Sequence, residues 1–404
     1  MKKQILLVME AVQMNGAVTG WLGYLDAIDK SEWDIDVFLF DSDRHDGLAL
    51  PDYVRKLPDD IHCVIERVGL SRALTYTLAR GRVDLALKRL WYSVMQRRYP
   101  RFRKWNLVKF AKAQTKHYDV AVGATMGASW EYVVNKVPAK QKLIWLDTNY
   151  HFAPWPEYWR NFNWCIDHVS ALVCVSEATR DMMRRENPNW ADKIYTMNYV
   201  IDSDRICRLA REKSQLPEKK CQWRLVTVGR YCQQKGQYLI SPIARKLKEN
   251  DISLEWHVVA PGCGRQKDAI MKDLVENGVD DVVFYHEGCP NPFAEMATAD
   301  IYVQPSVFEG FGLTVSEAMI TGRYVVATDI PEFREQITDS SIGILSALTV
   351  EAFTEAIESA MRVVEGGKNC RDYKTPYTKA RTYGQFIDIL RRSDPGKQDQ
   401  EAIE

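Results

Sequence analysis

The sequence lacks any apolar run that approaches the ~18 residues of a membrane-spanning helix. Its start, MKKQILLVMEAV, is similar to a secretory leader only briefly. Because Glu10 interrupts the apolar run and no small-residue cleavage site follows, we expect a first β-strand there. No C-x-x-C pair occurs among the nine cysteines, and their scattered spacing favours neither a zinc site nor a disulfide framework. These absences favour a cytoplasmic protein with reduced cysteines.

An excess of charge of one sign is also lacking, because Lys and Arg together number 54 and Asp and Glu also number 54. This balance gives no overall field to attract nucleic acid or an acidic partner. The stretch 79–117 departs from it, with twelve basic residues against the single acid Asp84 and aromatic residues between them. Basic amphipathic helices of this kind bind anionic membrane surfaces. We therefore expect peripheral contact with the inner face of a membrane. A solvated basic face is the alternative. No nucleic-acid partner is expected, because no recognition motif accompanies the charge.

Short apolar runs alternate with helix-like segments along the chain. They occupy 5–11, 35–41, 118–124, 142–147 and 171–176 in the first half, and 224–229, 254–260, 282–288, 300–306 and 324–329 in the second. Strands that are apolar throughout and alternate with helices indicate parallel sheets covered on both faces. The sequence therefore predicts an α/β fold of two Rossmann-like doubly wound domains that face each other across a cleft. The predicted segments are a first domain (1–205), a second domain (206–375), and a helix packing back on the first domain followed by a frayed tail (376–404).

Two glutamates, Glu309 and Glu317, bracket a Gly-Phe-Gly step in the stretch FEGFGLTVSEA (308–318). The stretch follows a predicted strand and opens a short helix that is expected to end near Gly322, and open α/β sheets bind ligands at such turns. A local role is the alternative, because Thr314 and Glu317 have the spacing of a capping box. These residues alone do not separate the two interpretations.

Two more strand-to-helix turns carry residues suited to phosphate. Gly16, in QMNGAVTGW (13–21), would let backbone amides face a phosphate at a helix N-terminus, although the G-x-G-x-x-G fingerprint is absent and a plain turn is the alternative. In TVGRYCQQKG (227–236), Arg230 offers a planar fork and Lys235 a point charge. Two solvated surface cations are the alternative for this pair.

Taken together, three motifs of the second half resemble those of the GT-B glycosyltransferases, most closely family 4 of the retaining enzymes. They are GR-x4-KG (229–236), APGCG (260–264) and E-x7-E (309–317). The phrase PSVFEGFGLTVSEAMITGRYVVATDIPEFREQI (305–337) is similar to that family nearly position by position. The resemblance extends from about residue 3 to about residue 385 and is looser in the first half.

The resemblance implies a role for each motif residue. Glu309 would face the transferred sugar at the reaction centre, and Glu317 would accept hydrogen bonds from the ribose of the donor. Arg230 and Lys235 would neutralise the leaving diphosphate, so no metal is expected. Gly16 would also contact the donor. Backbone N–H groups at the helix N-terminus would bind the diphosphate, and they belong to Phe311, Gly312, Leu313 and Thr314.

The first half departs from the family in KLIWLDTNYHF (142–152), where relatives carry a histidine that contacts the donor sugar. Asp147 takes that position here, and either Asp147 or His151 would make the contact. A buried capping aspartate is the alternative. The aromatic stretch NYHFAPWPEYWRNFNW (149–164) fits an acceptor platform or a packed lid equally well.

The sequence therefore predicts a retaining hexosyltransferase of polysaccharide biosynthesis. Its donor would be a nucleotide-diphospho-sugar, with a UDP-sugar favoured over a GDP-sugar, and its acceptor a glycan or lipid-linked glycan. No cofactor is expected. A sugar-nucleotide epimerase of similar architecture and an inactive nucleotide-sugar-binding protein are the alternatives, and the second rests on Asp147.

Overall fold

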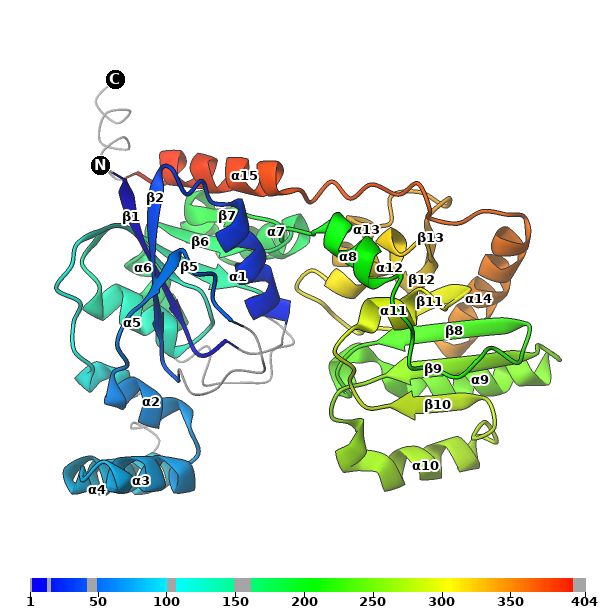
Figure 1. The fold of residues 1–404 in the computed structure, drawn as a ribbon, viewed down its shortest axis with the longest axis horizontal. Coiled ribbons are helices and arrows are strands. Elements are labelled where there is room, and N and C mark those ends of the chain that lie inside the picture. The colour runs from blue at the N-terminus through cyan, green and yellow to red at the C-terminus, as the bar shows by residue number, and fades with distance from the viewer. Residues whose placement is uncertain (1, 13–15, 42–48, 100–106, 149–160, 395–404) are drawn as a thin grey trace. The chain divides into compact units, whose positions relative to one another are not determined.

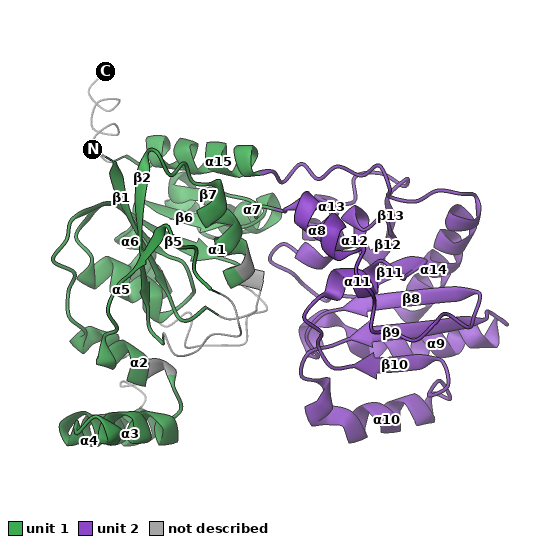
Figure 2. Ribbon diagram, in the orientation of Figure 1, with its two compact units in different colours: residues 1–200, 379–404 green, residues 201–378 purple. Residues whose placement is uncertain are grey.

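The computed structural model describes residues 2–12, 16–41, 49–99, 107–148 and 161–394. The chain divides into two compact units (Figure 2). Unit 1 comprises residues 1–200 and 379–404, and unit 2 comprises residues 201–378. No helix in the described part of the chain is both long enough and apolar enough to cross a bilayer.

Unit 1 contains, within its described residues, a parallel sheet of seven strands in the order β3-β2-β1-β4-β5-β6-β7 (Figure 1). The strands are β1 (Lys3–Met9), β2 (Trp33–Leu39), β3 (Val54–Lys56), β4 (Tyr118–Gly123), β5 (Ala139–Leu146), β6 (Ala171–Cys174) and β7 (Ile194–Thr196). The five residues Ile5 to Met9 of β1 are all buried, as a central strand covered on both faces requires.

Helices surround this sheet. They are α1 (Gly16–Ala27), α2 (Ile61–Arg67), α3 (Leu70–Ala79), α4 (Val83–Arg98), α5 (Ala128–Lys136), α6 (Phe162–Asp167), α7 (Glu177–Glu186) and α15 (Lys379–Arg392), with 3-10 turns η2 (Leu107–Phe110) and η4 (Pro188–Lys193). The last helix, α15, returns to unit 1 and packs against α1 (Figure 1). Gln141 of β5 donates to the Leu390 carbonyl at 2.8 Å, which ties α15 to the sheet.

Unit 2 contains, among the residues described, a parallel sheet of six strands in the order β10-β9-β8-β11-β12-β13. The strands are β8 (Trp223–Val228), β9 (Leu254–Val259), β10 (Val283–His286), β11 (Ile301–Gln304), β12 (Tyr324–Thr328) and β13 (Gly343–Ser346). The helices are α8 (Ser203–Leu209), α9 (Ile240–Glu249), α10 (Lys267–Glu276), α11 (Pro292–Met296), α12 (Leu313–Ile320), α13 (Pro331–Arg334) and α14 (Val350–Glu365), with 3-10 turns η5 (Gln233–Lys235), η6 (Gln237–Leu239) and η7 (Cys263–Gln266).

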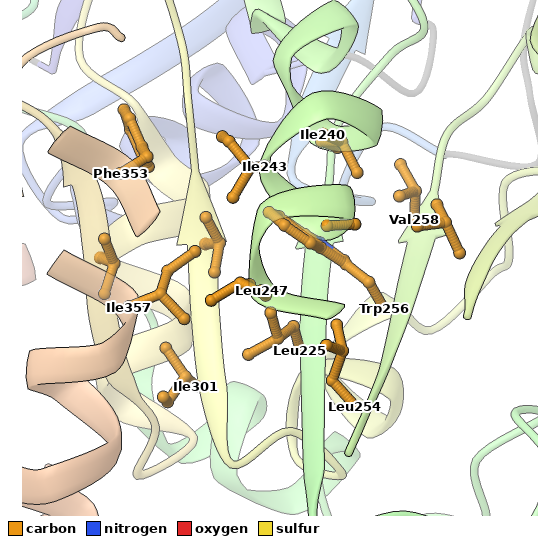
Figure 3. Close-up of a cluster of buried hydrophobic side chains, with 14 of the residues drawn as sticks. Leu225, Ile240, Ile243, Leu247, Leu254, Trp256, Val258, Ile301, Phe353 and Ile357 are labelled. Carbon is orange, nitrogen blue, oxygen red and sulfur yellow. The ribbon is translucent and has the colours of Figure 1, made fainter. Parts of the chain in front are cut away.

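One face of the second sheet packs against α9 and α14 in an apolar core (Figure 3). Its members include the buried side chains of Leu225, Ile240, Ile243, Leu247, Trp256, Ile301, Phe353 and Ile357. Because side chains alternate across a strand, the residues between them point to the other face. On β11 that face carries Tyr302 and Gln304, both fully buried and both polar. A polar row therefore runs along β11 toward the loop that follows it.

The predicted α/β class and its two Rossmann-like sheets are confirmed, and all ten predicted apolar runs overlap strands. The strands β3, β7 and β13 were not predicted. Each has only three or four residues and lies at the edge of its sheet. Strands this short carry too few residues to show an apolar pattern in sequence.

Candidate active site

A chain of hydrogen bonds continues the polar row of β11 into the loop 305–312. The Tyr302 hydroxyl donates to Gln304 Oε1 at 2.7 Å, and Gln304 Nε2 donates to the Ser306 hydroxyl at 2.8 Å. Ser306 then donates to Glu309 Oε1 at 2.6 Å. All four side chains are buried, and a fully satisfied buried network is rigid. These hydrogen bonds therefore hold the Glu309 carboxylate in one position.

Lys235 completes this arrangement from the 3-10 turn η5, in the loop that follows the neighbouring strand β8. Its Nζ lies 2.7 Å from Glu309 Oε1, and both side chains are largely buried, with 13% and 6% of their surface exposed. The backbone brings the two loops together, because the Val307 N–H donates to the Gln234 carbonyl at 2.8 Å. Gly236 ends η5 with φ 63°, and a Cβ there would lie 1.7 Å from the Pro305 carbonyl oxygen. Only glycine permits this approach.

The second glutamate lies on α12, which begins at Leu313 with Gly312 as its N-cap residue at φ 87°. The capping-box interpretation of Thr314 and Glu317 is wrong, because Thr314 already lies inside the helix. Its hydroxyl donates to Gln304 Oε1 at 3.3 Å instead. The Glu317 carboxylate, half-buried in the first turns of α12, has no hydrogen-bond or ion-pair partner among the described residues.

Burial raises the pKa of Glu317 to about 7, against the opposing charges of Arg205 and Lys235. A partly buried carboxylate with a raised pKa and no hydrogen-bond donor among the described residues favours a ligand contact over a structural role.

The remaining predicted residues of unit 2 lie at the same edge of the sheet. Arg230 follows Gly229 at the end of β8, is exposed, and has no ion-pair partner in the described part of the chain. Phe311 is 2% exposed, and its ring packs edge-on against that of Tyr377 with the ring centroids 4.8 Å apart. The Phe311 carbonyl accepts a hydrogen bond from Gln336 Nε2 at 2.5 Å. The Phe311 ring is therefore part of the core.

The APGCG loop is held by the side chain of Glu287, which follows β10. The Glu287 carboxylate accepts the backbone N–H of Gly262 at 2.5 Å and that of Gly264 at 3.0 Å. These backbone hydrogen bonds lower the pKa of Glu287 below its ordinary value. The loop after β9 is thereby fixed to the loop after β10.

Of the site residues predicted in unit 1, two lie in its described part. Gly16 is the first residue of α1, and Asp147 follows β5 half-buried. Burial, and next the charge of Asp147, raise the pKa of the Tyr199 hydroxyl well above its ordinary value. Tyr24 shifts in the same direction through burial, Tyr199 and Asp147, in that order. His151 lies outside the described residues, as does most of the aromatic stretch 149–164.

Tyr302, Gln304 and Ser306 were missed in the sequence. The signal was present, because polar residues at every second position interrupt the apolar run DIYVQPS (300–306). Such a period places them on one face of a strand.

The two units define a protein of the GT-B class, and comparison with known proteins agrees. Sucrose-phosphate synthase from Thermosynechococcus elongatus has the same fold, with a TM-score of 0.63 at 14% identity over 100% of both chains. HepE from Anabaena, solved in complex with UDP, has a TM-score of 0.57 at 13% identity over 100% of this chain and 98% of that one.

Residues 222–362 match the family described as glycosyl transferases group 1. A D-inositol 3-phosphate glycosyltransferase from Arthrobacter sp. (strain FB24) is 32% identical over 140 residues, which is 33% of each chain. The chain therefore spans about a third of the length of this curated relative. The matched segment lies within unit 2, and the predicted resemblance to GT-B glycosyltransferases is confirmed.

Proposed function

We propose that this chain is a cytoplasmic, metal-independent, retaining hexosyltransferase of polysaccharide biosynthesis. Its donor is a nucleotide-diphospho-sugar, a UDP-sugar in preference to a GDP-sugar, and its acceptor is a glycan or lipid-linked glycan. The observation that carries the proposal is the ion pair of Lys235 and Glu309, held by a buried hydrogen-bond chain inside the segment that matches glycosyl transferases group 1. HepE, which shares the fold, was solved with UDP, and this supports the choice of nucleotide.

The Glu309 carboxylate has one occupied and one accessible oxygen. Oε1 accepts from both Ser306 and Lys235, whereas Oε2 has no hydrogen bond to another described residue. An ionised carboxylate accepts through both oxygens, so Oε2 is available to a hydroxyl of the transferred sugar. Fixing Oε1 sets the direction of Oε2, which is the preorganisation that a reaction centre requires.

Positive groups at the strand ends suit a diphosphate that gains charge as it leaves. The Lys235 ammonium has three donors, and Glu309 uses one of them. Arg230 adds an exposed fork at the end of β8. The N–H groups that begin α12 would face an anion bound at the same edge, because the helix dipole favours negative charge there. We assign these groups to the diphosphate and Glu317 to the ribose hydroxyls.

In the proposed front-face reaction, the donor C–O bond to the diphosphate breaks while the acceptor oxygen bonds to the anomeric carbon. The leaving phosphate oxygen takes the acceptor proton, so no protein base is assigned. The carboxylate-spacing rule for glycoside hydrolysis does not apply to Glu309 and Glu317. Asp147, or His151, is proposed to contact the donor sugar from unit 1.

The test is a donor-consumption assay with a panel of UDP- and GDP-sugars, with and without a glycan acceptor, in the presence of a chelator. Release of UDP only when acceptor is present supports the proposal. Consumption of the donor without acceptor would indicate an epimerase instead. Thermal stabilisation by a donor without any turnover would indicate a binding protein that has lost activity.

A further inference from the structure

Helix α4 has two apolar faces. Its inner face contributes Leu85 and Tyr92, which are 3% and 2% exposed and pack in a small core with Ile65, Val68 and Ala73. A surface helix normally has one such face and presents polar residues on the other. Figure 1 shows α3 and α4 side by side at the end of unit 1, beyond α2.

The outer face of α4 is also apolar and is exposed. Val83, Leu87, Leu90 and Val94 recur at the spacing of one helix face, and they are 55%, 62%, 43% and 55% exposed. We call these four residues, Val83, Leu87, Leu90 and Val94, the outer stripe. A contiguous exposed apolar patch of this kind marks a surface that another apolar phase covers.

The charges beside the outer stripe are cationic. Arg82 precedes α4, and Arg97 and Arg98 end it, all exposed. The one acid of α4, Asp84, accepts two hydrogen bonds from Arg82 at 3.0 and 2.9 Å, and this lowers its pKa to about 2.

Other cations of 79–117 turn away from the outer stripe. Arg89 donates to the Ile65 carbonyl at 3.0 Å, and Lys116 lies 3.0 Å from Asp36. The outer stripe is therefore a narrower surface than the whole basic segment.

We propose that the outer stripe docks on an anionic lipid surface. Its apolar side chains enter the boundary between headgroups and acyl chains, and the arginines at the two ends of α4 contact lipid phosphates. A second copy of the chain fits less well. A two-fold interface would pair the patch with itself and bring the terminal arginines of both copies together.

This proposal goes beyond the sugar transfer and does not depend on it, because binding to vesicles is measured without donor or acceptor. The full chain is sedimented with vesicles of phosphatidylcholine alone, and with vesicles of equal parts phosphatidylcholine and phosphatidylglycerol. We expect binding to the anionic vesicles only, weakened by added salt.

The matched variants separate the two contributions. Leu87→Asp with Val94→Asp should lower binding by about tenfold or more, because buried apolar area is lost. Arg97→Gln with Arg98→Gln should lower it by about 25-fold, at roughly fivefold for each arginine. Val275→Asp on α10, where the side chain is 59% exposed, makes the same type of change in unit 2 and should leave binding unchanged.

Three results would overturn the proposal. They are no binding of the wild type to anionic vesicles, undiminished binding of the Leu87 and Val94 double variant, and a dimer in sedimentation velocity that this double variant dissociates. The last result would assign the outer stripe to a second copy. Because all five substituted positions are exposed, the variants should keep the circular dichroism spectrum and melting temperature of the wild type.

Discussion

Lys235 Nζ lies 2.7 Å from Glu309 Oε1, although the two residues are 74 positions apart in the sequence. The pair joins the ends of β8 and β11, and no water-exposed surface ion pair would hold two loops so firmly. Its position at the C-terminal edge of a parallel sheet is where α/β proteins bind ligands. The predictions below begin with this pair and then consider the groups around it.

Removing the cation should destabilise the protein and stop the reaction. Lys235→Met leaves a buried carboxylate without its partner, which costs about 3–5 kcal/mol of unfolding free energy. Urea unfolding measures this loss. The double variant with Glu309→Gln should recover much of the stability but none of the activity, because the uncompensated charge is gone. Equal stability of the single and double variants would contradict a coupled pair.

Ser306 is predicted to act through Glu309 by positioning it. Ser306→Ala removes one of the two donors to Oε1, and we expect kcat to fall about tenfold while the KM for the donor changes little. Ser241→Ala is the control, because this fully buried hydroxyl donates to Asp273 away from the site. The control should lose similar stability, about 1 kcal/mol, without loss of kcat. Equal kinetic losses in both variants would count against a positioning role.

Glu317 should make stability fall as pH rises. Its pKa is raised from the ordinary value of 4.5 to about 7, so the folded protein binds this proton more tightly than the unfolded chain does. Unfolding free energy should therefore decrease between pH 4.5 and 7, by up to roughly 3 kcal/mol. Comparing Glu317→Gln with the wild type across this range isolates the effect. Parallel profiles of the two proteins would disprove it.

His257 should make the protein less stable as pH falls. Burial, the neighbouring His286 and Arg224 lower its pKa from 6.5 to about 4, and its Nδ1 lies 2.9 Å from His286 Nε2. The unfolded chain then binds more protons between pH 6.5 and 4, so stability should fall as pH falls through this window. His257→Asn should flatten the acid limb of the unfolding curve. An unchanged acid limb would show that another group controls it.

Gly236 should tolerate no side chain. A Cβ would lie 1.7 Å from the Pro305 carbonyl oxygen, so Gly236→Ala must separate the two loops that carry Lys235 and Glu309. We expect the unfolding free energy to fall by well above the ~1 kcal/mol that an unfavourable φ alone would cost. We also expect donor binding to be lost. Gly278→Ala is the matched control, because Gly278 has nearly the same φ, 66°, and no atom within 4 Å.

The sequence was sufficient for the fold and for the positions of the two charged loops, because apolar periodicity and turn residues are local signals. It was not sufficient for the direct contact of Lys235 with Glu309, which depends on how β8 and β11 pair. The start of α12 at Leu313 was also missed, since a capping box two residues later matched equally well. Burial, and to a smaller extent the charge of Asp147, raises the pKa values of Tyr24 and Tyr199. These two tyrosines are far apart in the sequence, so no local pattern indicates that they lie near Asp147.

The hydrogen bonds along β11 all run in one direction. Gln304 receives a hydrogen bond on its oxygen and gives one from its nitrogen, so Ser306 must accept from it and has a single proton left to give. That proton goes to Glu309. The series thus ends in a carboxylate oxygen that only accepts hydrogen bonds, from Ser306 and from Lys235. The last acceptor of this series is therefore fixed in direction by the strand that precedes it, and a change at Tyr302 or Gln304 would reach the site through hydrogen bonds alone.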